Sequence, residues 1–576
     1  MARILRVNLG DQTLRLEDIP RACEGLGGRG LTSAIVALEV PPTAEPLGPN
    51  NKLVFAPGLL GGTRSANSGR LSVGCKSPLT SGIKEANSGG QPGGHLARLG
   101  LAAVVVEGRA EPGTWWQLEL DKDGARLVPS ETSGLNNYES VDRLAGRHGR
   151  RASFISIGRA GEFRLAAASI ALTDRDGLPS RHAGRGGVGA VMGSKGLKAI
   201  VINPEGAPAP PLVDSSGFSQ ASRRFARALK QHPVCGQMAA YGSAAMMNLF
   251  NEAGAVPTRN FSSGRFENPE AVSGENLNRL TRERGGEGRV AKGCMQGCLI
   301  RCSGVFPDRE GRRVGKWPDY ETLWAFGPNT GIDDLDMIAR YDRLCDDTGV
   351  DTIDVGAAIA LMMEAGRLEF GDAAGALKLV EEISAGTMTG RVIGSGAAVT
   401  GRVLGLSRVP QVKGQALSAF DPRSVKGQGA AFATNPQGAD HTAGPAYAAN
   451  LLAIGGEVDP LAVQGQVELA REAQVSAAAI DTLGLCLFVS FAVFETPAAL
   501  KAIVDMLNAR YGWSTSVEDL AGLGRRVLDL ELDFNRRAGF TAADDRLPEF
   551  MTSEKVGPHN STFDIPEADL DRTLRW

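Results

Sequence analysis

The stretch SRHAGRGGVGAVMGSKGLKAI (180–200) decides which kind of fold the chain adopts. Its glycines at 187–193 approach the spacing of a dinucleotide-binding loop, but the apolar run KAIVI (198–202) follows them. A dinucleotide loop comes after its strand, so the sequence does not favour a nicotinamide site here. The stretch still offers many backbone N–H groups together with Arg181 and Arg185, which suit phosphate anions.

Outward from this stretch, the first 204 residues are rich in short β-like runs separated by glycines. The runs lie at 3–9, 52–58, 102–108, 116–121, 152–158 and 198–204. Few helical periods lie between them. A Pro/Ala stretch at 205–214 has the composition of a linker.

After this linker the periodicity becomes helical. Helices are predicted at 216–231, 333–347, 352–367, 373–386 and 516–537. For the last of these, Thr515 with Glu518 fits a capping box. A second break falls near 405–428, and no internal repeat is visible. The pattern predicts an α+β protein with a β-rich domain at 1–208 and two mostly α-helical domains at 209–410 and 411–576.

Composition excludes several classes of protein. Hydrophobic residues make up 42% and charged residues 22% of the chain, as in an ordinary soluble protein. The formal net charge of −3 gives no reason to expect nucleic-acid binding. The N-terminus has no secretory signal, and no apolar run reaches the roughly 18 residues of a membrane span. We therefore expect a cytoplasmic protein without a membrane segment, in which the 74 glycines allow tight turns or close approach to a ligand.

Three of the eight cysteines lie within nine residues, as Cys294, Cys298 and Cys302. They would line one side of a helix, or close around a metal if the backbone is looped. Three cysteines in nine residues are improbable as a chance core stripe, so we favour metal or iron–sulfur binding. Zinc usually shows two C-x2-C pairs, which are absent. A cubane cluster needs a distant fourth ligand. Cys486 is a candidate, although it also fits a core cysteine.

Two polar segments have both a functional and a structural interpretation. Residues 65–94 combine Arg70, Lys76 and Asn87 with two Gly-Gly pairs, and form either loops for a phosphorylated ligand or hairpin turns. The carboxylates of 346–354 could bind amide-type donors or a cation. Spacing alone favours helix caps there, with Asp351 or Thr352 as the capping residue.

Two further residues are candidates for proton transfer. His441 is one of only six histidines and lies among small residues in GADHTAG (438–444). A lone histidine is more often structural, but its flanking glycines raise the case for acid–base chemistry. Glu321 closely follows the cysteine cluster and could be a second acid–base group.

Taken jointly, these motifs resemble the tungsten-containing aldehyde ferredoxin oxidoreductase family over nearly the whole chain. The matching stretches are ILRVNL, GLGGRGL (25–31), LVFAPGLLGGT (53–63), GRLSVGCKSPLTSGIKEANSGG (69–90), AGRGGVGAVMGSKGLKAI (183–200), the cysteine triplet, DDTGVDTID (346–354) and DTLGLC (481–486). The resemblance implies a β-rich cofactor base closed by two helical domains, with the active site at their interface.

The resemblance also implies the cofactors and the residues that hold them. The metal would be tungsten, with molybdenum as the alternative, held by two pterins whose phosphates are bridged by Mg²⁺, beside one [4Fe-4S] cluster. The implied cluster ligands are Cys294, Cys298, Cys302 and Cys486. The implied cofactor-binding residues are Arg70, Lys76, Asn87, Gly89, Arg181, His182, Ala183, Gly184, Arg185, Asp346, Val350, Asp351, Asp481 and Leu487. Glu321 and His441 match the positions proposed for proton transfer.

The chain departs from the archaeal members in two ways. Its triplet reads C-x3-C-x3-C where theirs typically reads C-x2-C-x3-C, and Gln437 and Ala443 stand near places where they carry basic residues. No E-x-x-H sequence supports the subunit-bridging iron of some members. These features fit a bacterial branch that works as an oligomer with a polyferredoxin-like or ferredoxin partner and, in some cases, a flavin (FAD) subunit.

The main functional hypothesis is oxidation of a small-molecule aldehyde to its carboxylic acid. Two alternatives are ring reduction of an aryl thioester, as in the class II benzoyl-CoA reductase subunit, and a non-catalytic electron-transfer or scaffold subunit.

Overall fold

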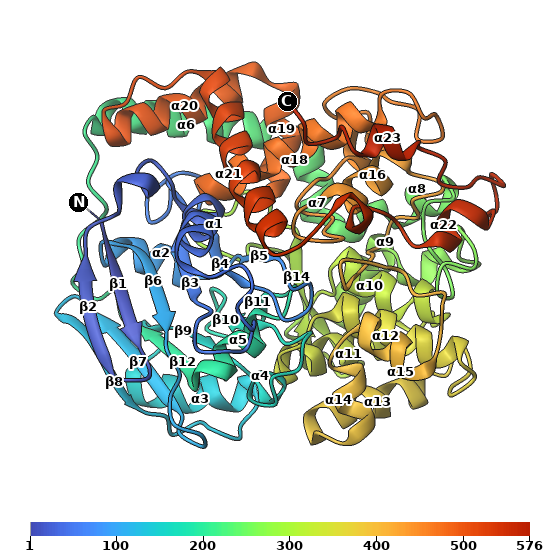
Figure 1. Cartoon of the computed structure of the whole chain (residues 1–576), viewed down its shortest axis with the longest axis horizontal. Coiled ribbons are helices and arrows are strands. Elements are labelled where there is room, and N and C mark those ends of the chain that lie inside the picture. Colours follow the sequence, from blue (N-terminus) through green and yellow to red (C-terminus); the bar gives the residue numbers. More distant parts are fainter. Residues whose placement is uncertain (1) are drawn as a thin grey trace.

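The computed structural model describes residues 2–576 and confirms the predicted α+β class (Figure 1). Two six-stranded sheets form the N-terminal part, and every run that we expected to be a strand contains one. In spatial order the first sheet contains β2 (Thr13–Glu17), β1 (Arg3–Asn8), β6 (Leu101–Glu107), β3 (Leu53–Pro57), β4 (Leu71–Lys76) and β5 (Ile83–Ser88). The second contains β11 (Arg181–Ala183), β10 (Ile170–Leu172), β9 (Ser153–Ser156), β12 (Leu197–Ile202), β7 (Trp116–Asp121) and β8 (Gly124–Pro129).

The alternation of side chains along the strands explains how these sheets pack. On β1, Leu5 and Val7 join a core with the second sheet, whereas Ile4 faces the opposite way, toward α1 (Gly28–Glu39). Helix α3 (Asn137–His148) covers the outer face of the second sheet. The N-terminal part therefore has four layers, helix–sheet–sheet–helix, because each sheet buries both faces.

The glycine-rich stretch that opened the sequence argument forms α5 (Val188–Lys195). A Cβ at Gly187 would lie 2.4 Å from the carbonyl oxygen of Ala166, and one at Gly193 would lie 1.9 Å from that of Gly161. These two glycines are therefore required for close packing of the helix. Gly184, further upstream, meets no atom within 4 Å at the Cβ position.

The predicted helices of the second part are all present. They are α6 (Ser215–Gln231), α11 (Leu335–Thr348), α12 (Thr352–Glu364), α13 (Ala373–Ala385) and α21 (Val517–Arg537). The capping box of α21 is shifted by one residue from the prediction, since Ser516 and Asp519 make it instead of Thr515 and Glu518. Asp351 is the N-cap of α12, where its side chain accepts from the backbone N–H of Ile353.

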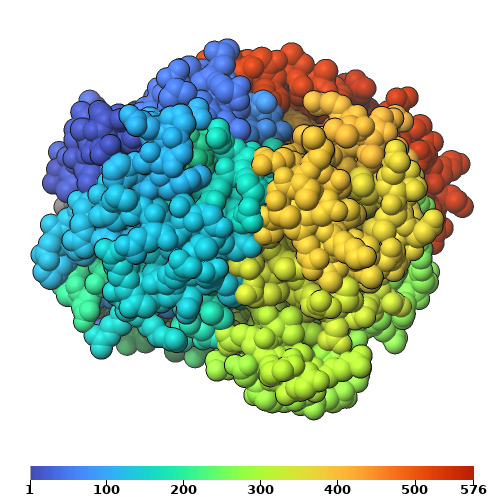
Figure 2. All heavy atoms as spheres, turned by 90° about the horizontal axis from the view of Figure 1, so that it is seen from below, coloured from blue at the N-terminus to red at the C-terminus, as the bar shows by residue number. Residues whose placement is uncertain are grey.

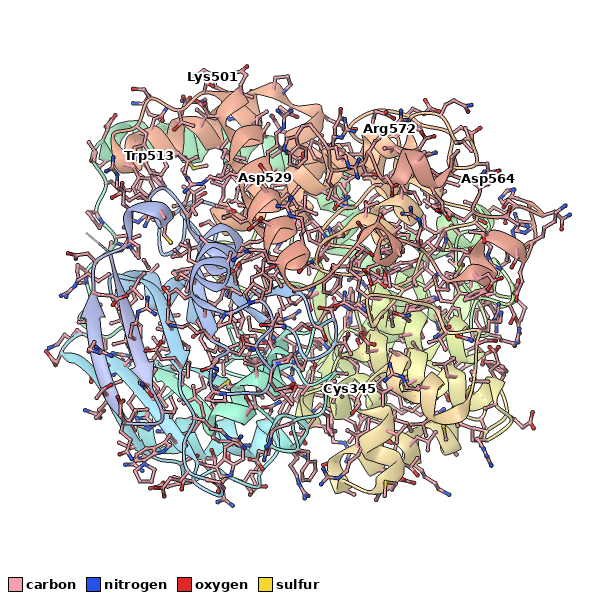
Figure 3. The ribbon with its side chains drawn as sticks, viewed as in Figure 1. Cys345, Lys501, Trp513, Asp529, Asp564 and Arg572 are labelled. Atoms are coloured by element: carbon pink, nitrogen blue, oxygen red, sulfur yellow. The ribbon has the colours of Figure 1, made fainter. Side chains whose placement is uncertain are left out.

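Segments far apart in sequence lie side by side above the sheets. Helix α6 lies beside α20 (Pro497–Tyr511), and Arg224 of α6 pairs with Asp505 at 2.6 Å (Figure 1). In Figure 2 the blue and cyan N-terminal part and the yellow and gold helices share one face of the molecule. Cys345 lies in the interior, whereas Lys501 and Arg572 lie at the periphery (Figure 3).

Among the described residues, no individual helix has the length and apolarity to cross a membrane. Only α18 (Gln466–Leu483) taken with the segment Leu487–Glu495 meets both criteria, as a pair bent by 117°.

Candidate active site

A cavity of about 320 Å³ lies where the N-terminal sheets meet the helices. Its wall combines β5, the segment that follows β11, the cysteine loop, the start of α10 (Tyr320–Phe326), and the loops at 437–443 and 481–488. The predicted site residues that line it are Arg70, Asn87, Gly89, Arg181, His182, Gly184, Arg185, Cys294, Cys302, Glu321, Asp346, Val350, Asp351, His441, Asp481, Cys486 and Leu487. Residues from every predicted domain thus meet at one place.

Three predicted site residues are not part of this lining. Lys76 donates to the carbonyl oxygen of Pro42 instead, so the structure gives no support to its predicted contact with the cofactor. Ala183 lies on β11, where it pairs with Ile170. Cys298 is buried behind the wall, next to Asn67.

The cysteine triplet lies in an irregular loop and not on a helix. Gly297, at φ +73°, interrupts the backbone between Cys294 and Cys298, which decides the alternative that the sequence left open. The Sγ of Cys298 accepts from Nδ2 of Asn67 at 3.6 Å, and the backbone carbonyl of Asn67 accepts from the N–H of Cys486 at 2.9 Å. Asn67 therefore joins the triplet to the fourth cysteine, a role that sequence reasoning missed.

Among residues 2–576, no group of three His, Cys, Asp or Glu side chains converges tightly enough to hold a single metal ion. A four-iron cubane does not require such convergence, because each cysteine thiolate binds a different iron atom. Gly89 lies close to the triplet, since a Cβ there would be 2.8 Å from the Sγ of Cys294.

Two arginines, of which Arg70 is partly buried and Arg181 is buried, supply positive charge to the cavity. Arg70 donates through Nη2 to the carbonyl oxygen of Asn87 at 2.9 Å, and the Nδ2 of Asn87 donates to Oδ1 of Asp481 at 3.1 Å. Arg181 donates through Nη2 to Ser303 at 2.7 Å, while its buried Nε has no partner. These guanidinium groups are suited to binding phosphate oxygens.

Arg185 ties the N-terminal part to the helices. Its Nε lies 3.1 Å from Oδ2 of Asp351, and its Nη1 donates to the carbonyl oxygen of Ala439 at 2.6 Å. Asp351 thus combines both interpretations of the 346–354 segment, because one carboxylate oxygen caps α12 and the other holds Arg185.

A second charged cluster surrounds Asp346. Lys316 lies 2.5 Å from Asp342 and 3.1 Å from Asp346, and His182 lies 3.3 Å from Asp346 through Nε2. Burial by itself lowers the pKa of Lys316, but the two carboxylates raise it well above its usual range. Lys316 and Asp342 were not predicted, and no local motif marks either residue.

The two proton-transfer candidates face each other. The Nε2 of His441 lies 3.5 Å from Oε1 of Glu321, whose Oε2 accepts from the N–H of Ala419 at 3.0 Å. Burial raises the pKa of Glu321 to about 8 and lowers the pKa of His441 to about 4. Between these values the carboxyl carries the proton and the imidazole is neutral, so the pair has one donor and one acceptor for acid–base chemistry.

Aromatic rings close the cavity beside this pair. Tyr320 and Tyr447 line it, and the ring of Phe420 stacks on that of Tyr447 at 4.4 Å. The hydroxyl of Tyr320 donates to the carbonyl oxygen of Ala419, and the N–H of Ala419 donates to Glu321. Ala419 therefore joins the side chains of Tyr320 and Glu321.

A β-rich base, a helical cover and a cavity that joins cysteines, arginines and an acid–base pair define a cofactor-dependent oxidoreductase. The chain belongs to the aldehyde ferredoxin oxidoreductase family. The family model described as "Aldehyde ferredoxin oxidoreductase, N-terminal domain" matches residues 4–204, and "Aldehyde ferredoxin oxidoreductase, domains 2 & 3" matches residues 220–575.

Individual relatives agree with this assignment. The chain is 35% identical to the tungsten-containing aldehyde ferredoxin oxidoreductase of Thermococcus kodakarensis and 34% identical to that of Pyrococcus furiosus, over 97% of this chain and 92% of each relative. A solved benzoyl coenzyme A reductase active-site complex, bound to 1,5-dienoyl-CoA, shares the fold at a TM-score of 0.81. The match covers 100% of this chain and 93% of the chain in that structure, at 19% sequence identity.

The residues fit the tungstopterin that this family implies. Gly184 lines the cavity with free space where a Cβ would stand, as a binding surface for a flat ring system requires. Three buried polar atoms make no hydrogen bond within the protein: Nε of Arg181, Oε1 of Glu321 and Nδ1 of His441. Such atoms are rare in native proteins unless a ligand or water satisfies them.

Proposed function

We propose that this protein is a tungsten bis-pterin oxidoreductase that converts an aldehyde and water into a carboxylate: RCHO + H₂O → RCOO⁻ + 3H⁺ + 2e⁻. The observation that carries the proposal is the pair of Glu321 and His441, whose side chains are 13% and 17% exposed and which faces the arginine-lined cavity of a chain belonging to this family. The bound cofactor would supply the two-electron oxygen transfer, with tungsten as the proposed metal and molybdenum as the alternative.

The chain's own residues have three tasks in this proposal. Arg70, Arg181 and Arg185 would hold the pterin phosphates together with Mg²⁺. Asp346, Asp351 and Asp481 would accept from the amine and amide edges of the pterins. The rings of Tyr320, Tyr447 and Phe420 exclude water around the substrate, so that the acid–base pair acts in a medium of low dielectric constant.

Proton handling falls to the facing pair. Neutral His441 would accept a proton as the substrate is oxidised, while its Nε2 faces Oε1 of Glu321 at 3.5 Å. Cys294, Cys298, Cys302 and Cys486 would hold a [4Fe-4S] cluster, which would supply one-electron transfer out of the site. The proposed acceptor is a ferredoxin-like protein or subunit, with a flavin subunit in an oligomeric cytoplasmic complex as an extension.

Replacement of His441 tests the proposal. His441→Asn preserves the size and polarity of the side chain and removes its basicity. We expect unchanged metal content and a loss of turnover on the order of 10²-fold or more. A wild-type rate would remove His441 from the mechanism.

Aryl-CoA ring reduction is a second candidate because the benzoyl coenzyme A reductase complex shares the fold. The two activities are separated by assaying benzaldehyde and benzoyl-CoA with the same purified protein. Oxidation of the aldehyde without reduction of the thioester supports the main proposal.

A further inference from the structure

A buried lysine reaches from the N-terminal sheet to the loop that carries His441. Lys84 lies on β5 and its side chain is fully buried. Its Nζ lies 2.5 Å from Oδ2 of Asp440, which stands 356 positions later in the chain, and 3.3 Å from Oε1 of Gln437. A buried lysine needs such a carboxylate partner because a buried charge left without its counter-charge is strongly destabilising.

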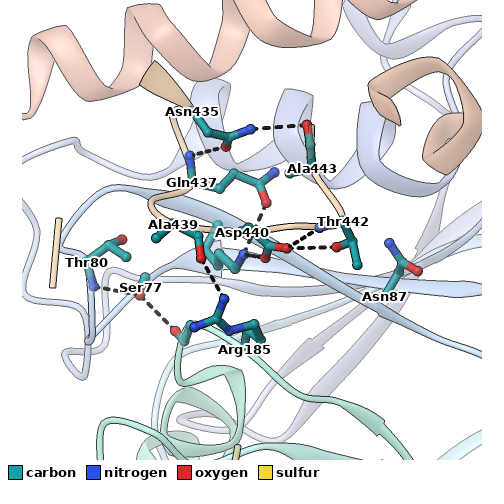
Figure 4. A network of polar contacts seen from close by, with 12 residues as sticks. Ser77, Thr80, Asn87, Arg185, Asn435, Gln437, Ala439, Asp440, Thr442 and Ala443 are labelled. Carbon is teal, nitrogen blue, oxygen red and sulfur yellow. Dashed lines mark hydrogen bonds and ion pairs between the residues drawn. The ribbon is translucent and has the colours of Figure 1, made fainter. Parts of the chain in front are cut away.

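The loop at 435–443 is fixed from several sides (Figure 4). Asn435 donates through Nδ2 to the carbonyl oxygen of Ala443 at 3.1 Å, and Arg185 holds the carbonyl oxygen of Ala439. The second oxygen of Asp440, Oδ1, accepts from both the N–H and the hydroxyl of Thr442, at 3.0 and 2.8 Å. Asp440 thus accepts from Lys84 with one oxygen and from Thr442, the residue after His441, with the other.

We propose that the ion pair of Lys84 and Asp440 is a positioning element for the Glu321–His441 pair. It fastens the His441 loop to the N-terminal sheet and cancels the charge beside the imidazole. This inference rests on the proton-transfer role given to His441 in the proposed function.

Charge balance explains why the lysine is needed. The charged and titratable groups that act on His441 are Asp440, Arg185 and Lys84, and Glu321 faces it across the cavity. Burial by itself would raise the pKa of Asp440, but Lys84 and Arg185 hold it well below its usual range, so Asp440 is an anion. An adjacent anion without Lys84 would favour a protonated imidazole. Burial is the largest cause of the lowered pKa of His441, and Lys84 acts in the same direction. Lys84 therefore helps to keep His441 neutral and able to accept a proton.

The two halves of the ion pair should have opposite effects on the acidic limb of the pH profile. Lys84→Met leaves Asp440 without its cation, so we expect the limb of kcat/KM set by His441 to move up by about one pH unit or more. Asp440→Asn leaves Lys84 unneutralised, so the limb should move down. The double variant Lys84→Met/Asp440→Asn removes both charges, and its limb should return toward that of the wild type.

The experiment uses the cofactor-loaded protein, with benzaldehyde as substrate and a viologen dye as electron acceptor. Hydrogen–deuterium exchange of residues 435–443 is a readout independent of activity and should speed up in both single variants. Misplacement of a proton-transfer group costs on the order of 10²-fold in kcat. We expect losses of about that size in the single variants, with tungsten and iron retained.

A matched control comes from the same part of the chain. Lys198 is fully buried and pairs with Glu162 at 2.6 Å, outside the cavity lining. Lys198→Met should lower thermal stability and leave the pH profile unchanged.

Two outcomes would overturn the inference. One is that both single variants keep the wild-type limb and wild-type exchange at 435–443. The other is a response typical of general structural damage. In that case both single variants move the limb in the same direction, or Lys198→Met moves it as well. A wild-type rate for His441→Asn would be a different failure, because it would remove the proposed proton-transfer role itself.

Discussion

Arg29 donates two parallel hydrogen bonds to Glu531, 502 positions later in the chain, from Nε at 2.9 Å and from Nη2 at 2.7 Å. Both side chains are fully buried. Glu531 also accepts from Ser33 and Gln437, and Nη1 of Arg29 lies 3.6 Å from Asp481 at the cavity. This ion pair therefore joins the N-terminal and C-terminal regions of the chain next to the cavity.

Breaking this pair should destabilise the whole protein. Arg29→Met leaves the Glu531 carboxylate buried without a cation, which costs about 3–5 kcal/mol. We expect a clear fall in the urea midpoint, and substantial recovery in Arg29→Met/Glu531→Met. The control Arg143→Met breaks a pair with Glu139 whose side chains are both more than half exposed, and it should change stability by less than about 1 kcal/mol. Equal effects of the two arginine variants would contradict the interpretation of a buried clamp.

The pH dependence follows from the acid–base pair. Since the pKa of His441 is lowered to about 4 and that of Glu321 is raised to about 8, kcat/KM should be level between them and fall outside. A carboxyl with a raised folded-state pKa also stabilises the fold below its unfolded pKa, and this stabilisation is lost as pH rises toward 8. Glu321→Gln should therefore remove the alkaline limb and flatten part of the decline in melting temperature over that interval. An alkaline limb that persists unchanged in Glu321→Gln would assign that ionisation to another group.

Iron binding should depend on the loop cysteines and not on the other buried thiols. Cys298→Ser keeps the backbone geometry and removes a thiolate that the proposed cluster requires. Iron content and the visible absorption of the cluster should drop sharply. Cys75, inside the core between the two sheets, gives the control Cys75→Ala, which should retain iron. Full iron loading of Cys298→Ser would contradict the ligand assignment.

Gly184 gives a test of the pterin surface that leaves the fold intact. A methyl group at this position meets no protein atom within 4 Å, so Gly184→Ala should fold with an unchanged melting temperature. It would stand in the space reserved for the cofactor, and tungsten content should fall. Gly146→Ala also has open space at its Cβ position but lies on α3, away from the cavity, and should keep its tungsten. Equal tungsten content in the two variants would place the pterin elsewhere.

Local patterns in the sequence predicted the six strand runs and five helices named above, whereas most of the predicted residues that line the cavity came from the family resemblance. Period-2 and period-3.6 alternation determine which faces are buried, so β1 and α21 could be predicted from their own residues. The cap of α21 was misplaced by one residue because Thr515–Glu518 and Ser516–Asp519 both fit the capping-box spacing. Only backbone dihedral angles distinguish the two, and composition does not encode them.

Residues whose role depends on distant partners could not be found in the same way. A lysine within a strand, such as Lys84, is usually expected to face solvent, and its partner Asp440 comes from another part of the chain. Lys76 was predicted because it stands with Arg70 and Asn87 in the polar segment 65–94, yet its ammonium group donates to the carbonyl oxygen of Pro42. Asn67 carries no cysteine-related signal, although it contacts both the triplet and Cys486. Gly297 was the one available sign that the triplet lies in a loop, since glycine at positive φ interrupts a helix.

Elemental analysis of anaerobically purified protein tests the central claim most directly. Plasma mass spectrometry for tungsten, molybdenum and iron should give about one tungsten and about four iron atoms per chain, as one metallopterin site and one [4Fe-4S] cluster require. Iron without tungsten or molybdenum, in folded protein with a complete cluster, would contradict the oxidoreductase proposal and favour an electron-transfer subunit.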